Sequence, residues 1–219
     1  MNFFGLILTI ILFVIFSRLN LKFPIMISVG VSIILILKIF NVDYFSYNQS
    51  ASFLSFLIAP ATIALAMPMY KNYHILLKNK RALYPALFLA TIVAIISTYF
   101  CAKIFGADFR VILSMLPKST TMPIALEISK AIDGYLEITA VVVALTGVFG
   151  GVFGHNILKL LKIKNDVSIG LALGSASHVI GTAACADKKK DRQVAASTIA
   201  LILVGLMSAI IIPLFKNFY

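Results

Sequence analysis

The chain has 219 residues, of which 61% are hydrophobic and only 12% are charged. Soluble domains carry charges on roughly a quarter of their residues, so this composition excludes a soluble protein and indicates an integral membrane protein. The net charge of +11 does not indicate a nucleic-acid partner, because the Lys and Arg residues lie in short clusters between apolar segments, as in membrane-protein loops.

Apolar segments of helical length follow one another along the whole chain and predict its helices. They cover residues 3–17, 23–40, 51–70, 83–105, 135–161, 168–186 and 194–215. A weaker segment, 112–132, carries Pro117 and Pro123, so we expect it to be re-entrant or interfacial. We therefore predict an all-α integral membrane protein with about seven transmembrane helices in a single domain, 1–219.

Two of the predicted helices carry residues that a continuous, lipid-facing helix does not tolerate. Segment 51–70 contains prolines, and segment 168–186 contains a cluster of small polar residues around one histidine. Proline removes an amide donor and clashes with the preceding turn, and each unpaired polar group in hydrocarbon costs several kcal/mol. We expect both helices to be interrupted, with their polar residues facing protein, water or a ligand.

The two interruptions occupy corresponding places in the two halves of the chain. The first repeat, 23–105, and the second, 135–219, share the order plain segment, interrupted segment, basic loop, plain segment. Residue identity between them is poor, so the repeat is a hypothesis based on layout. Paired interruptions indicate inverted repeats whose interrupted helices cross at the central site of a transporter.

Half-helices that begin inside the membrane point free amides and a positive dipole end at the bilayer centre, which favours a small carboxylate ligand. The alternative is that the small residues only permit tight helix packing. His178 is able to bind the carboxylate when protonated, to relay a proton or to hydrogen-bond a neighbouring helix. From the two interruptions, the candidate binding residues are Pro60, Thr62, Gly174, Ser175, Ser177, His178, Gly181 and Thr182.

The proline-flanked segment adds Lys118, Ser119 and Thr120 to the candidate binding residues. A lysine in a membrane segment is costly unless it reaches the interface or finds a partner. Lys118 therefore either lies at the membrane surface or faces a cavity as a functional cation. We expect the glycines at 147–154 to form a close-packing face, with His155 at headgroup level beyond them.

The sequence contains no hydrolase motif, metal-ligand spacing or paired catalytic carboxylates. We therefore expect no enzymatic activity, no metal and no cofactor.

The chain resembles the LrgB/CidB family of bacterial membrane proteins. The resemblance rests on PATIALAMPMY at 60–70, PKSTTMPIA at 117–125 and GLALGSASHVIGT at 170–182. It implies a multi-pass protein of the bacterial cell membrane, with inverted repeats and crossed, interrupted helices, that works beside a small LrgA/CidA-type membrane protein. Where relatives often continue the last motif with Ala-Arg, this chain has Ala183-Ala184-Cys185, so no fixed cation is carried over there.

Two functions follow from the resemblance. The first is a secondary carrier for 2-oxo or 2-hydroxy monocarboxylates such as pyruvate, glycolate or glycerate, and by analogy with such carriers we expect a homodimer. The alternative is a holin- or antiholin-like protein that regulates murein hydrolases and autolysis. We favour the carrier, because a holin needs neither interrupted helices nor a buried polar cluster.

Overall fold

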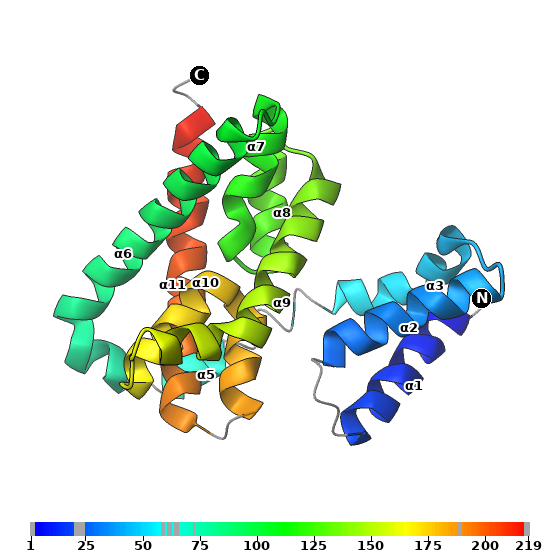
Figure 1. The fold of residues 1–219 in the computed structure, drawn as a ribbon, viewed down its shortest axis with the longest axis horizontal. Coiled ribbons are helices and arrows are strands. Elements are labelled where there is room, and N and C mark those ends of the chain that lie inside the picture. Colours follow the sequence, from blue (N-terminus) through cyan, green and yellow to red (C-terminus); the bar gives the residue numbers. More distant parts are fainter. Residues whose placement is uncertain are drawn as a thin grey trace. The chain divides into compact units, whose positions relative to one another are not determined.

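The computed structural model describes residues 3–19, 25–57, 60, 63, 66–71, 73–187 and 190–216. Every regular element in these ranges is a helix, which confirms the all-α prediction (Figure 1). The α-helices are α1 Phe4–Arg18, α2 Ile25–Ile39, α3 Tyr44–Phe56, α5 Ala66–Lys71, α6 Tyr73–Ile104, α7 Phe109–Met115, α8 Met122–Ala131, α9 Leu136–Leu160, α10 Asp166–Asp187 and α11 Asp191–Lys216, with one 3-10 helix, η1, at Leu116–Ser119.

The chain divides into two compact units, Met1–Ala64 and Leu65–Tyr219. In the first, α1 packs against α2 and α3. Gly5 permits the contact with α3, because a Cβ atom there would meet the Tyr47 carbonyl, and the Gly5 amide donates to Ser50 Oγ at 3.0 Å. Thr9 Oγ1 lies 2.8 Å from the Tyr47 hydroxyl.

The structure corrects the predicted segment 51–70, because α3 begins at Tyr44 and ends at Phe56. The early start has a local cause: the Asp43 carboxylate accepts a hydrogen bond from the Phe45 amide at 3.0 Å, as an N-cap residue does. Pro60 is described and exposed, whereas Thr62 lies outside the described residues. The predicted interruption of this segment and its crossing with segment 168–186 therefore remain predictions.

The second unit holds helices that match the predicted membrane spans. Four segments of the described chain are long and apolar enough to cross a membrane: Lys80–Ile104, Leu136–Leu160, Asp166–Ala186 and Asp191–Leu214. The shorter apolar helices Phe4–Arg18 and Ser28–Ile39 fall below the roughly 20 residues that a span needs. The length and apolar composition of these four helices indicate a membrane protein. The seven-span arrangement with inverted repeats remains a prediction.

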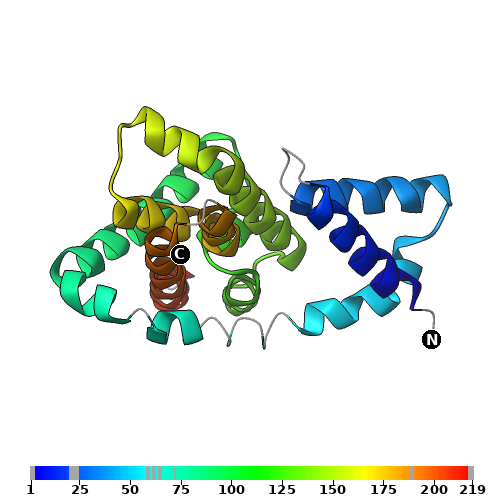
Figure 2. The same cartoon turned by 90° about the horizontal axis from the view of Figure 1, so that it is seen from below.

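Helix α11 lies at the centre of the second unit and is seen nearly end-on in Figure 2. It packs against α10 and also contacts α6 and α8. Leu83 and Leu87 of α6 form one buried cluster with Ile199 and Val204 of α11. This core fixes α6, α10 and α11 as the frame around which the remaining elements are placed.

Residues 109–131 fold back on themselves as the hairpin α7, η1 and α8. Its two ends meet: Arg110 Nε donates to the Asp133 carbonyl at 2.7 Å, and the Tyr135 amide donates to Ser114 Oγ at 2.7 Å. Thr139 of α9 joins this base, with its Oγ1 atom 2.8 Å from the Ser114 carbonyl oxygen. Since α7 has 7 residues and α8 has 10, and a helix rises about 1.5 Å per residue, neither helix is long enough to cross a bilayer. The re-entrant or interfacial placement of this segment remains a prediction.

Candidate functional site

Helix α10 is broken in the middle. Ser177 has φ −132° and ψ 16°, and His178 has φ 42° and ψ −131°, so the helical backbone stops and restarts there. Gly181 lets the two halves approach closely, because a Cβ atom at this position would meet the Leu173 carbonyl. The predicted interruption of segment 168–186 is therefore confirmed, and it lies between Ser177 and His178.

The glycine-rich face of α9 lies directly opposite the break. A Cβ atom at Gly150 would meet the Ser177 side chain, and one at Gly147 would lie 2.5 Å from His178 Cε1. The glycines thus form the close-packing face that their spacing predicted, and they leave room for the irregular backbone of α10.

We expect Gly150→Ala to lower the free energy of unfolding by about 1–3 kcal/mol, since a methyl group forced into a filled contact displaces its neighbours. Thermal unfolding in detergent, followed by loss of the monodisperse gel-filtration peak, measures the change. Gly30→Ala is the matched control, because a Cβ atom at Gly30 meets nothing within 4 Å. Equal behaviour of the two variants would contradict the close contact between α9 and α10.

His178 is buried and binds the neighbouring helix. Its Nε2 atom lies 3.1 Å from the Val143 carbonyl oxygen of α9, and because a carbonyl only accepts, Nε2 carries the proton and donates it. His178 is not among the residues that line the nearby cavity. Of the three roles left open by the sequence, this geometry favours the hydrogen bond between helices.

A cavity of about 480 Å³ lies beside the break, between α6, the hairpin tip, α9 and the first half of α10. Its polar lining residues are Lys118, Ser119, Thr146, Ser175 and Ser177. The Ser177 hydroxyl makes no hydrogen bond with any residue that the structure describes, so it is available to a ligand. The remaining lining is apolar or glycine.

Lys118 is the one charged residue that lines this cavity among the described residues. It is half-buried, its Nζ atom lies 3.5 Å from Ser119 Oγ, and no described carboxylate lies within ion-pair distance of it. The sequence left two positions possible for Lys118, the membrane surface and a cavity. In the structure Lys118 lines a cavity.

The structure brings together Lys118, Ser119, Ser175 and Ser177 and places the other predicted residues that it describes elsewhere. Gly174 packs on the Ser197 backbone of α11, and Thr182 Oγ1 lies 2.7 Å from Ser197 Oγ. Thr120 Oγ1 donates to the Pro117 carbonyl within the hairpin tip at 2.9 Å. These three residues and Gly181 serve packing, which is the alternative that the sequence left open. Pro60 belongs to the other unit.

One feature of the cavity and one of the adjoining hairpin escaped the sequence analysis. Thr146 and Gly150 of α9 line the cavity, but the glycine spacing around them was interpreted as helix packing alone. Thr121, at the N-cap of α8, is buried with its hydroxyl unpaired among the described residues. Such a group costs about 1–3 kcal/mol unless a water or ligand satisfies it, and only the folded hairpin shows that it is buried.

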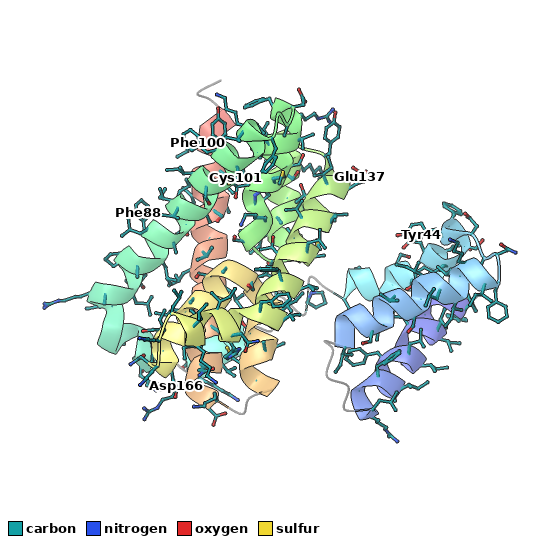
Figure 3. The ribbon with its side chains drawn as sticks, in the orientation of Figure 1. Tyr44, Phe88, Phe100, Cys101, Glu137 and Asp166 are labelled. Carbon is teal, nitrogen blue, oxygen red and sulfur yellow. The ribbon has the colours of Figure 1, made fainter. Side chains whose placement is uncertain are left out.

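A polar network closes one end of the second unit. His155 Nε2 lies 3.0 Å from Gln193 Oε1, and Gln193 Nε2 donates to Asp166 at 2.7 Å. Lys190 pairs with the same carboxylate at 3.4 Å. Asp166 stands at the start of α10 (Figure 3), so His155 lies near charged groups at a helix end. Its expected position at headgroup level remains a prediction.

Comparisons with known proteins agree on one family. The profile of the LrgB-like family matches residues 8–218. "Antiholin-like protein LrgB" of Bacillus mycoides (strain KBAB4) is 35% identical over 185 residues, covering 84% of this chain and 80% of that protein. "Uncharacterized protein YxaC" of Bacillus subtilis (strain 168) is 30% identical over 214 residues, covering 95% and 93%. No solved structure matches significantly. The chain belongs to the LrgB-like family.

Proposed function

We propose that this protein is a secondary carrier for small monocarboxylates and that the cavity beside the α10 break is its binding site. One observation carries the proposal: Lys118 lines this cavity, and no carboxylate among the described residues lies within ion-pair distance of it. An unpaired ammonium in apolar surroundings is costly. A substrate carboxylate would neutralise the charge and form a charge-assisted hydrogen bond.

The residues that line the cavity also support small monocarboxylates as the class of substrate. A single cation matches a substrate with one carboxylate better than a substrate with two carboxylates. The Ser119 hydroxyl beside Lys118 and the unpaired Ser177 hydroxyl supply neutral donors for a neighbouring oxygen. A 2-oxo or 2-hydroxy monocarboxylate such as pyruvate, glycolate or glycerate has one carboxylate and an oxygen on the neighbouring carbon, which matches these donors. The interrupted α10 and the hairpin tip, which meet at the cavity, would provide the movement for alternating access.

A second candidate function is antiholin-like regulation of murein hydrolases in a bacterial cell membrane, together with an LrgA/CidA-type small membrane protein. The observation that favours it is the name of the relative at 35% identity, "Antiholin-like protein LrgB". The comparisons support this function better than they support the carrier, whereas the cavity supports the carrier. The two are compatible, because flux of a metabolite through a carrier can alter wall turnover indirectly.

Uptake of labelled pyruvate and glycolate by proteoliposomes, with and without the LrgA/CidA-type protein, tests the proposal. We expect saturable uptake that Ser177→Ala reduces by about tenfold, the effect of one lost hydrogen bond to a charged group. Ser97→Ala, at an exposed position of α6, should leave uptake unchanged. Absence of saturable uptake in both preparations would reject the carrier, and leakage of unrelated dyes would favour a holin-like pore.

A further inference from the structure

We propose that the cavity binds monocarboxylates with a branched apolar tail, such as 4-methyl-2-oxopentanoate, more tightly than three-carbon acids. This inference rests on the proposed carrier function and specifies its substrate class. The lining of the cavity carries it: among the described residues, one cation and several hydroxyl groups lie with a larger number of apolar side chains.

The first step is the size of the cavity. Its volume is about 480 Å³, which at roughly 30 Å³ per molecule corresponds to on the order of sixteen waters. A three-carbon acid displaces only a small part of that water. The remaining water would stay against the cavity walls unless the substrate is larger than a three-carbon acid.

The second step is the chemistry of the walls. Leu158 of α9 and Leu173 of α10 line the cavity and are buried, 8% and 2% exposed, so they form its floor. Val93 and Phe149 line it from α6 and α9 but are more than half exposed, so they form its mouth. Water held against such a surface is unfavourable, whereas an apolar tail that displaces it gains about fourfold in affinity per buried methylene group.

The third step is the position of the polar groups relative to this wall. Lys118 and Ser119 lie together on the hairpin tip. The apolar lining side chains come from α6, α9 and α10, and α9 and α10 also contribute the hydroxyl groups of Thr146, Ser175 and Ser177. A monocarboxylate bound by its charged end at the tip would therefore extend its other end along the apolar side chains. A second carboxylate would meet no second cation among the described lining residues, which disfavours dicarboxylates.

The experiment compares 4-methyl-2-oxopentanoate with pyruvate in proteoliposomes, by uptake of each labelled acid and by competition between them. We expect the apparent KM of the branched acid to be about tenfold or more below that of pyruvate. Ala94→Leu, which adds volume to the cavity lining on α6, should raise the KM of the branched acid by about tenfold and change that of pyruvate less than about threefold. Ala86→Leu, an exposed position of the same helix outside the cavity, should change neither.

Several results would overturn the inference. Saturable uptake of pyruvate without uptake of the branched acid, or an equal effect of Ala94→Leu on both, rejects it and leaves the carrier function standing. Absence of uptake for both acids rejects the inference and the carrier together. Ala90→Leu, also in the cavity lining, provides a second variant if Ala94→Leu does not yield a monodisperse protein.

Discussion

Replacing Lys118 with methionine should reduce saturable pyruvate uptake by about 10- to 100-fold, because a hydrogen bond to a charged group is worth about 1.5–3 kcal/mol. Methionine keeps the length and the apolar stem of lysine but removes the ammonium group. The same variant should unfold at a higher temperature than the parent protein, since it removes a half-buried cation that pairs with no carboxylate among the described residues.

The opposite directions of the two effects distinguish binding from misfolding. A variant that loses uptake because it is misfolded loses thermal stability as well. Lys130→Met is the matched control, because Lys130 is exposed on α8, and it should change neither uptake nor stability appreciably. Full uptake by Lys118→Met would remove the cation from the binding site and with it the main support for a carboxylate substrate.

The helices of the second unit were predictable because their signals are local. Unbroken apolar runs specify α9 and α11, and Pro117 and Pro123 mark the turn of the hairpin. The break in α10 was also predictable, since clustered glycine, serine and histidine in a membrane helix oppose a continuous apolar surface. The start of α3 at Tyr44 was not, because it depends on the single cap that Asp43 provides.

The different contacts that the polar residues of α10 make were not predictable from the sequence. Ser177 and His178 are neighbours in the chain, yet Ser177 lines the cavity while His178 points at Val143 of α9. In a regular helix, neighbouring side chains point about 100° apart. Here the irregular backbone instead places both against α9, Ser177 at Gly150 and His178 at Gly147 and Val143. Thr182 faces Ser197 for a comparable reason, since the second half of α10 restarts with a new direction that packing against α11 determines.

The backbone at His178 yields a stability test of the interruption itself. With φ at 42° and ψ at −131°, His178 occupies a conformation that costs a residue with a side chain about 1–3 kcal/mol and glycine little. Both His178→Ala and His178→Gly lose the ring and its hydrogen bond to Val143, at about 2–4 kcal/mol. Glycine should then recover about 1–2 kcal/mol of that loss, so His178→Gly should be the more stable variant in thermal unfolding.

That order is the reverse of the order in a regular helix, where alanine is favoured over glycine by about 1 kcal/mol. Val141 of α9, exposed and in regular helix, provides the comparison: Val141→Ala should be more stable than Val141→Gly. The sign of the difference therefore reports the backbone at each position, whatever the ring contributes. If alanine is the more stable replacement at both positions, α10 runs unbroken through residue 178, and the irregular backbone that places Ser177 at the cavity does not exist.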